Sequence, residues 1–401
     1  MPFVWFVVNN SSVSAIPKTM RAIVYRGVND LRLETVPVPR LRAHELLVRV
    51  AVCGVCPTDI KKILHGTVPP PRIFGHETAG TIVRIGGGAS VLASRFKIGD
   101  RVALHHHVPC LDCHFCRHRA FAQCETYKRT GITAGFEPAG GGYAEYVRVL
   151  PFVLPGVVNI PAKNSFAEGA MLEPVNTVLK AVRRLNLLRG DVVLVAGQGP
   201  IGLMFTRLLQ RQGVRVLATD LLPARLKLAR KFGAKWVLNA GQASRLSPSI
   251  SIHSQKSETG RMPVPQSGLD AAIVAVPSDA VVRQALQLVR GGGQVLLFAH
   301  TKRHTKPELR TPNSQLPAPS SQLPAPNLQI DLASICLDEK DLIGSYSSDF
   351  TLQREVARLV FSRRLDVRPL ITHRFPLEQT AAAVALAANP TANSLKIIVA
   401  P

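Results

Sequence analysis

The pattern of hydrophobic and polar positions divides the chain near residue 166. Before that point, short segments alternate apolar and polar residues, as in LLVRVAV at 46–52 and YAEYVRV at 143–149, with Gly and Pro between them. An alternation with a period of two residues indicates half-buried β-strands. The pattern therefore predicts a β-rich, barrel-like domain over residues 20–165.

After residue 166, apolar runs alternate with helical stretches. The run VVLVAG at 192–197 precedes the helical stretch IGLMFTRLLQRQG, and VRVLATD at 214–220 precedes PARLKLARKFG. Strands that alternate with helices favour a parallel sheet joined by right-handed crossovers. The predicted fold class is therefore α/β plus β, with a doubly wound parallel-sheet domain over residues 166–346.

The ends of the chain and two inserts complete this division. Residues 244–267 and 301–330 are rich in Ser and Pro, and the second insert holds the tandem repeat SQLPAPS–SQLPAPN, so we expect solvated loops there. Residues 347–401 predict two amphipathic helices and a strand that return to the first domain. Residues 1–19 precede a fresh alternating segment that Met20 opens, and we interpret them as an extension outside the native fold.

Composition narrows the class of protein. The 401 residues are 46% hydrophobic, enough for about two packed domains. No apolar run approaches the roughly 18 to 20 residues of a membrane span, so we expect no membrane role. A formal net charge of +23 would attract polyanions. The basic residues are mostly scattered arginines, however, which favours solvated faces over a nucleic-acid-binding surface.

Seven cysteines without a secretory signal favour metal binding in a reducing compartment, and we expect a cytoplasmic protein. Four of them, Cys110, Cys113, Cys116 and Cys124, are spaced C-x2-C-x2-C-x7-C. This run suits an iron–sulfur cluster, a nucleic-acid-binding zinc module or a zinc that braces a loop. Four ligands close a structural zinc, whereas a catalytic zinc has about three protein ligands and an open position. The run therefore fits the closed type.

A glycine-rich turn follows the first buried strand of the predicted parallel sheet. Gly197, Gly199 and Gly202 have G-x-G-x-x-G spacing, which makes a tight turn, admits a pyrophosphate and allows close helix packing. Asp220 ends the next strand; its carboxylate accepts from a ribose 2′-hydroxyl and repels a 2′-phosphate, so NAD is favoured over NADP. The predicted cofactor-binding residues are Gly197, Gly199, Pro200, Ile201, Gly202, Asp220 and Arg225.

A second group of metal-binding residue types lies earlier in the chain. Cys56, Asp59, His76 and Glu77 fall within 22 residues. A thiolate, an imidazole and carboxylates together make a mixed site of the open, catalytic sort. The neighbouring Cys53 is interpreted as buried packing.

The order of these motifs resembles that of the zinc-dependent medium-chain dehydrogenase/reductases, the alcohol dehydrogenase superfamily. It reads CGVCPTD, then GHE, the four-cysteine lobe, GGGYAEY, a Glu-Pro pair at 173–174 and the Rossmann glycines. The chain is most similar to the sorbitol, polyol and threonine dehydrogenase branch, because Glu173 stands where liver-type alcohol dehydrogenases have a cysteine ligand. The resemblance implies a GroES-like catalytic domain, a Rossmann NAD-binding domain and two zinc ions per chain.

Individual roles follow from this resemblance. It implies that Cys56, His76 and Glu173 surround the catalytic zinc, with Glu77 either a direct ligand or able to exchange with bound water. It also implies that Asp59 orients His76.

Three further roles concern the proton path and the lobe. The resemblance implies that Thr58 begins proton transfer out of the site. Lys61 stands where liver-type enzymes have the histidine that ends the proton relay, so the path beyond Thr58 stays open. Cys110, Cys113, Cys116 and Cys124 match the structural-zinc lobe.

The leading hypothesis is a zinc-dependent oxidoreductase. Hydride would pass to NAD from a secondary alcohol, a polyol or a hydroxy amino acid, which would become a ketone. Tyr346, Ser347 and Ser348, after the last predicted strand, are candidates to contact nicotinamide or substrate. The alternatives are an NADPH-dependent carbonyl reductase of the same fold and a non-enzymatic, zinc-stabilised protein that senses dinucleotides or binds nucleic acid. The resemblance also implies a homo-dimer or homo-tetramer. The substrate itself does not follow from the sequence.

Overall fold

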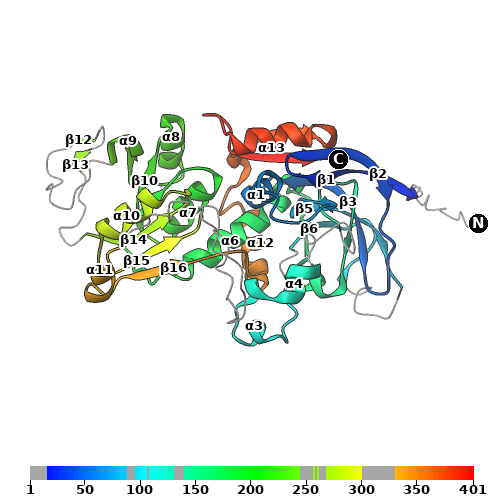
Figure 1. Cartoon of the computed structure of the whole chain (residues 1–401), viewed down its shortest axis with the longest axis horizontal. Coiled ribbons are helices and arrows are strands. Elements are labelled where there is room, and N and C mark those ends of the chain that lie inside the picture. Colours follow the sequence, from blue (N-terminus) through cyan, green and yellow to red (C-terminus); the bar gives the residue numbers. More distant parts are fainter. Residues whose placement is uncertain are drawn as a thin grey trace, which may run out of the picture.

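The computed structural model of the chain consists of two halves side by side, each built on its own sheet (Figure 1). It describes residues 16–87, 95–105, 108–130, 140–243, 256–257, 260–261, 268–299 and 330–401. The tandem repeat and most of the predicted N-terminal extension lie outside these residues. Within that extension, Lys18 O accepts from Val38 N at 3.0 Å and Thr19 begins the first strand.

The first half contains a seven-stranded and a three-stranded sheet. In the larger sheet β3 is central, because β5, β7 and the C-terminal strand β18 (Lys396–Ala400) all pair with it antiparallel. Its strands from this half are β3 (Leu46–Gly54), β5 (Glu77–Ile85), β6 (Arg101–Leu104), β7 (Tyr146–Val149) and β8 (Val158–Asn159). The smaller sheet has the order β2-β1-β4 and contains β1 (Thr19–Gly27), β2 (Asp30–Pro37) and β4 (Arg72–Ile73). The barrel-like first domain predicted from the alternation is thus a β structure.

Short helices connect these strands. They are α1 (Pro57–His65), α3 (His114–Arg117), η1 (Phe121–Gln123), α4 (Glu125–Thr130), η2 (Pro151–Gly156) and α5 (Phe166–Ala170). The helix α5 shows how local sequence sets such an end. The Ser165 side chain accepts from Glu168 N, and the Glu168 side chain accepts from Ser165 N, which satisfies amides that a helix start leaves without partners.

The second half is a six-stranded parallel sheet with the order β11-β10-β9-β14-β15-β16. In chain order this is 3-2-1-4-5-6, the arrangement of doubly wound dinucleotide-binding domains. The strands are β9 (Val192–Ala196), β10 (Arg215–Asp220), β11 (Trp236–Asn239), β14 (Leu269–Val274), β15 (Val289–Leu297) and β16 (Asp341–Gly344). The predicted fold class is confirmed.

Helices accompany this sheet because β9, one of its central strands, is apolar along its whole length. Every residue of β9 is buried, as expected for a parallel strand that is buried on both faces. The helices of this half are α7 (Pro200–Arg211), α8 (Pro223–Lys231), α9 (Ala240–Ala243), α10 (Asp279–Leu288) and α11 (Leu332–Leu337). In the first Ser/Pro-rich insert, the described residues form only the short hairpin of β12 (Lys256–Ser257) and β13 (Gly260–Arg261).

The helix α6 (Leu172–Val182) lies between the two halves and contacts α7, α12 and β5 (Figure 1). Val175, Val178 and Leu179 are buried in a core that also takes side chains from β9 and α12 (Gln353–Phe361). Glu173 stands in the first turn of this helix, so burial of α6 fixes the backbone that carries its carboxylate.

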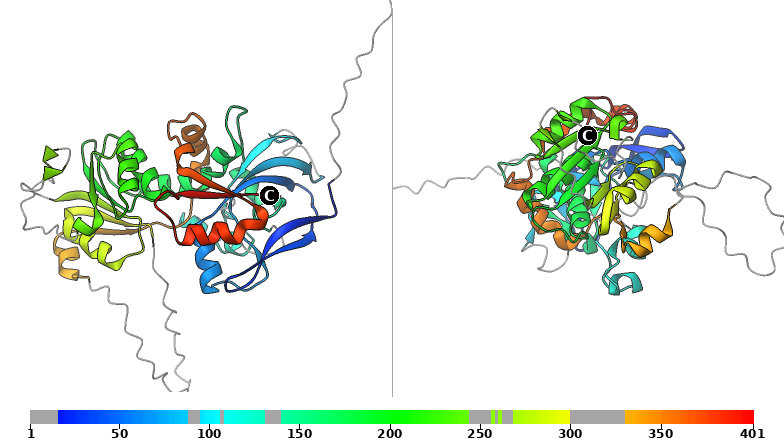
Figure 2. Two further views of the ribbon diagram at one scale, coloured as in Figure 1. Left: turned by 90° about the horizontal axis from the view of Figure 1, so that it is seen from above. Right: turned by 90° about the vertical axis from the view of Figure 1, so that its left-hand side faces the viewer.

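The C-terminal part runs back to the first half. It contains η3 (Phe350–Leu352), α12, η4 (Arg368–Leu370), β17 (Ile371–Pro376), η5 (Leu377–Gln379), α13 (Thr380–Ala388) and β18 (Lys396–Ala400). The left view of Figure 2 shows α13 (red) beside the blue strands, and α13 contacts α1. The strand β18 pairs with the end of β3 at Cys53 and Gly54. Among the described residues, no helix is both long and apolar enough to span a bilayer.

Candidate active site

Cys56 stands at the start of α1. The helix begins with Pro57, whose fixed φ suits the first helical position, and ends at Gly66 with φ 60°. Cys56 has extended backbone angles, and its Sγ accepts from Thr58 N at 3.5 Å. The start of the helix therefore fixes the position of the Cys56 sulfur.

His76 lies against Asp59, which comes from the first turn of α1. His76 Nδ1 lies 3.1 Å from the Asp59 carboxylate, and both side chains are buried. Burial alone would lower the pKa of His76, but the negative charges of Asp59 and Cys56 outweigh it and raise that pKa well above its usual value. An Nδ1–H that donates to Asp59 leaves Nε2 as the ligand atom, the arrangement usual for metal-binding histidines.

Cys56, His76 and Glu77 form a compact donor group. One ligand atom from each lies within 4.8 Å of the other two. Zinc bonds of about 2.0 to 2.3 Å to N, O and S could be made to all three, so the residues fit this metal. Glu173 is outside this closest group but buried, and it is near enough to Glu77 to act on its charge.

Lys396, the first residue of β18, is a further residue at the site that the sequence did not predict. Its ammonium forms a buried ion pair with the Glu77 carboxylate and donates to Val55 O at 2.9 Å. Burial opposes the charged form, but Glu77 and Cys56 raise the pKa of Lys396, so the ammonium remains protonated. The one signal in the sequence is a lysine at the start of the otherwise apolar strand KIIVA.

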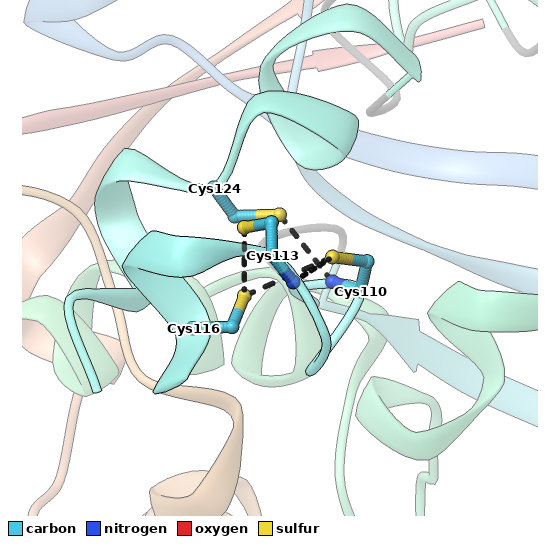
Figure 3. A group of neighbouring side chains, drawn as sticks. All are labelled: Cys110, Cys113, Cys116 and Cys124. Atoms are coloured by element: carbon cyan, nitrogen blue, oxygen red, sulfur yellow. Dashed lines mark hydrogen bonds between the residues drawn. The ribbon is translucent and has the colours of Figure 1, made fainter. Parts of the chain in front are cut away.

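The four lobe cysteines gather into a second donor group (Figure 3). Cys116 Sγ lies 3.5 Å from Cys113 Sγ and 3.9 Å from Cys110 Sγ. A tetrahedral zinc with bonds of 2.3 Å separates its sulfurs by about 3.8 Å, so the group fits a single zinc ion. The backbone N–H groups of Asp112 and Cys113 donate to the Cys110 sulfur and lower the pKa of Cys110 to about 6, which favours the thiolate.

The glycine-rich turn joins β9 to α7 as the motif requires. Gly197 has φ 93°, and Gly199 precedes Pro200 at the helix start. Open space lies where Gly199 would carry a Cβ, whereas a Cβ at Gly202 would collide with Gly197 O. The backbone is thus open to a phosphate at the second glycine and tightly packed at the third.

Asp220 ends β10, and its side chain is hydrogen-bonded to the glycine-rich turn. Its carboxylate accepts from Gln198 N at 2.7 Å and from Leu222 N at 2.9 Å. Arg225 on α8 lies 3.9 Å from the same carboxylate, and its guanidinium reaches Ser394 O at 3.5 Å. Asp220 therefore stands at the C-terminal edge of the parallel sheet, next to the turn.

The residues after β16 form a short segment near the donor group. Tyr346 is 49% exposed. Burial raises its pKa, although His76 opposes the shift, while Cys56 and Glu173 add to it. Ser347 has φ 61°, in the left-handed region. Ser348 Oγ lies 3.4 Å from His105 Nε2. His106 and His107, which follow His105 in the sequence, are outside the described part of the chain.

Comparisons with known proteins agree with this arrangement. Residues 42–161 match the alcohol dehydrogenase GroES-like domain, and residues 200–361 match the zinc-binding dehydrogenase domain. D-xylulose reductase A of Aspergillus oryzae is 30% identical over 70% of this chain and 76% of its own length. The chain belongs to the zinc-binding alcohol dehydrogenase family.

Two further relatives cover nearly the whole dehydrogenase. A sorbitol dehydrogenase of Bacillus subtilis is 27% identical over 96% of this chain and 98% of its own length. The structure of an alcohol dehydrogenase from a Thermus species is 27% identical, covers 95% of this chain and 99% of that chain, and has a TM-score of 0.74. The predicted membership in the sorbitol and polyol branch of the medium-chain dehydrogenases is confirmed, and the protein is an oxidoreductase.

Proposed function

We propose that this dehydrogenase oxidises a secondary alcohol or polyol to a ketone, with NAD as hydride acceptor. The observation that carries the proposal is the group of half-buried Cys56 with buried His76 and Glu77, and buried Glu173 near Glu77, in a chain that also has the glycine-rich cofactor turn. Relatives named sorbitol dehydrogenase and D-xylulose reductase support a polyol substrate.

Cys56, His76 and Glu173 are proposed to hold the catalytic zinc. Glu77 is nearer to the other two ligands, but its carboxylate is paired with Lys396. Binding through Glu77 would break this buried ion pair, which is costly where water does not replace the lost partner. Zinc bound here would polarise the substrate oxygen and lower the pKa of the substrate hydroxyl.

Thr58 is proposed to relay the proton that the substrate hydroxyl loses, with its Oγ1 accepting that proton while its own hydroxyl proton passes on. It is half-buried in the first turn of α1, two residues after Cys56. Lys61 lies one turn further along the same helix, where burial lowers its pKa and Cys56 opposes the shift. Side chains three residues apart on a helix share one face, so Lys61 continues the path from Thr58 toward solvent.

NAD is proposed over NADP because of Asp220. A carboxylate at the end of β10 can accept from the ribose 2′-hydroxyl but repels a 2′-phosphate. Arg225 is adjacent, but its side chain already contacts Asp220 and Ser394 O. The Asp220 carboxylate therefore largely offsets the positive charge of Arg225, which leaves little attraction for a 2′-phosphate.

A panel of polyols, threonine and simple secondary alcohols, assayed with NAD and with NADP at equal concentrations, tests this function. We expect at least one polyol or secondary alcohol to reduce NAD, and NAD to be preferred by about tenfold or more, since one unfavourable charge contact of about 1.4 kcal/mol gives this factor. Activity that requires NADP would contradict the argument from Asp220. Failure of every alcohol, together with activity on ketones and NADPH, would favour the carbonyl reductase.

A homo-dimer or homo-tetramer is proposed from the edge of the parallel sheet. The last strand, β16, has only β15 as a described neighbour, and Leu342 on it is exposed. Leu332 and Leu337 on the adjacent α11 are 75% and 82% exposed. An edge strand beside exposed leucines offers backbone and apolar surface to a second copy.

Light scattering of the purified protein tests the assembly. We expect a mass of two or four chains, and a shift toward one chain in the variant Leu337→Lys, because a buried charge opposes association. The matched change Leu188→Lys alters another exposed leucine, in the loop before β9, and should leave the mass unchanged. A wild-type mass of one chain would contradict the proposal.

We further propose that the protein is cytoplasmic, because its cysteines form no disulfides among the described residues.

A further inference from the structure

The four-cysteine lobe has a small core of its own that contains two aromatic side chains. Tyr127 on α4 is buried with Cys116 and Cys124, and Phe121 packs against the same group. The sulfur atoms therefore organise not only the backbone of the lobe but also the rings beside them. Whatever fixes the cysteines also fixes Tyr127 and Phe121.

Both aromatic residues reach the segment 345–350, which follows β16. The Tyr127 hydroxyl lies 3.5 Å from Ser347 Oγ. The rings of Phe121 and Phe350 meet edge to face with centroids 5.6 Å apart. The lobe residues (cyan) and this segment (orange) are thus in contact although more than 200 residues separate them (Figure 1). These are two contacts on one short piece of chain.

The helix α6 holds the other side of this segment. Asn176 accepts from Asp349 N at 2.8 Å and donates to Asp349 O at 2.9 Å, and Lys180 donates to Tyr346 O at 2.8 Å. Glu173 is on the same helix, three residues before Asn176. The segment 345–350 is therefore held on one side by α6, which carries the proposed zinc ligand Glu173, and on the other side by the four-cysteine lobe.

Tyr346 is the residue of the segment whose side chain is influenced by the charges of the donor group. Its phenol is half-exposed and lies within electrostatic range of His76, Cys56 and Glu173. Tyr127 is buried and lies within the same range of Tyr346, His76 and Glu173. The charges of His76 and Glu173 therefore act on both phenols, one from the lobe and one from the segment.

We infer that the four-cysteine lobe is a positioning element of the substrate site, which through Tyr127 and Phe121 fixes the segment 345–350 and thereby Tyr346. Ser347 makes this support necessary. Its φ of 61° is strained for a residue with a side chain, and such a conformation persists only where surrounding contacts hold it. The inference rests on the proposed alcohol oxidation and gives the lobe a part in substrate affinity.

The variants Tyr127→Phe and Ser347→Ala test the inference from the two sides of one contact. Each should raise KM for the alcohol by about three- to tenfold, the value of one hydrogen bond, with kcat changed by less than about twofold. The double variant should be no worse than either single variant, because both remove the same contact. Tyr146→Phe is the control: it removes a phenol from β7, which pairs with β3, and should leave KM unchanged.

Hydrogen exchange provides a readout that does not depend on turnover. Tyr127→Phe should accelerate amide exchange in the peptide that covers residues 345–350, without changing exchange in α6 or in β18. Cys113→Ser, which removes one lobe thiolate, should do the same and more strongly, while the protein still binds NADH.

These measurements separate the possible failures. An unchanged KM and unchanged exchange in both Tyr127→Phe and Ser347→Ala overturn the inference and leave the lobe as a surface brace, even if Cys113→Ser fails to fold. If the wild-type protein oxidises no alcohol, the proposed function fails, and the exchange data still decide whether the lobe fixes the segment.

Discussion

Replacement of Cys56 by alanine is expected to abolish alcohol oxidation and to lower the zinc content from about two ions per chain to about one. The thiol is at the start of α1, within 4.8 Å of ligand atoms from His76 and Glu77. Loss of the thiol leaves an incomplete donor set for zinc, which would supply the Lewis acid that stabilises negative charge on the substrate oxygen. A stabilisation of about 4 kcal/mol corresponds to about a thousandfold in rate.

Cys53→Ala is the matched control for this experiment. Cys53 is a fully buried thiol three residues away on β3, and its Sγ lies 3.4 Å from Thr78 Oγ1, outside the donor group. Burial raises the pKa of Cys53 to about 12, so this thiol stays protonated and does not compete for metal. The control should keep its zinc and most of its turnover. Unchanged turnover in Cys56→Ala, with the native fold shown by circular dichroism, would contradict the role assigned to Cys56.

The zinc content of Cys56→Ala also separates the two donor groups. The lobe sulfurs are fixed by their own backbone hydrogen bonds, such as Cys110 N to Cys124 Sγ at 3.3 Å, and share no residue with the catalytic group. The remaining ion should therefore be the lobe zinc. Complete loss of zinc would show that the lobe does not fold around its metal independently.

The sequence alone predicts those parts of the molecule in which all the functional residues come from one short stretch of chain with a characteristic spacing. The glycines at 197, 199 and 202 lie between a strand and a helix, and a cysteine run with short spacings can close around one metal ion. Both patterns are local, because loop and ligands come from one stretch of chain. The alternation of strands and helices likewise predicts the parallel sheet, in which every connection except the one from β11 to β14 joins neighbouring strands.

Contacts between distant residues do not follow from such patterns. Lys396 and Glu77 are 319 residues apart, and they meet only because β18 pairs with β3. Tyr127 and Ser347 are 220 residues apart and meet across the boundary between the lobe and the return segment. In each case the residue type was visible in the sequence but its partner was not.

The buried pair of Lys396 and Glu77 leads to the second large effect. Replacement of Lys396 by methionine is expected to cost about 3 to 5 kcal/mol of stability at neutral pH, because it leaves the Glu77 carboxylate buried without its counter-charge. Glu77 is only 1% exposed, so water does not reach it to compensate. The measurement is the free energy of unfolding in urea, followed by fluorescence and circular dichroism.

The pH dependence of this loss has a definite sign. In Lys396→Met, burial raises the pKa of Glu77 and no ammonium opposes it, so the folded state binds a proton that the unfolded state releases. Stability of the variant then falls as pH rises above the unfolded pKa of about 4.3. The deficit relative to the wild type should be smallest near pH 4 to 5 and grow toward pH 8. Glu77→Gln in the same chain should remove this growth.

Two further variants decide whether loss of the Lys396–Glu77 ion pair causes the loss of stability. Lys396→Arg keeps a cation at this position and should recover more than half of the lost stability. Lys340→Met removes another largely buried lysine, which bonds Leu286 O at 3.1 Å and Asp338 at 2.9 Å. Asp338 is 48% exposed at its side chain, so it stays solvated, and this change should cost only about 1 kcal/mol. Equal losses in Lys396→Met and Lys340→Met would show that the lysine acts by packing alone, and that the counter-charge of Glu77 is supplied by another group.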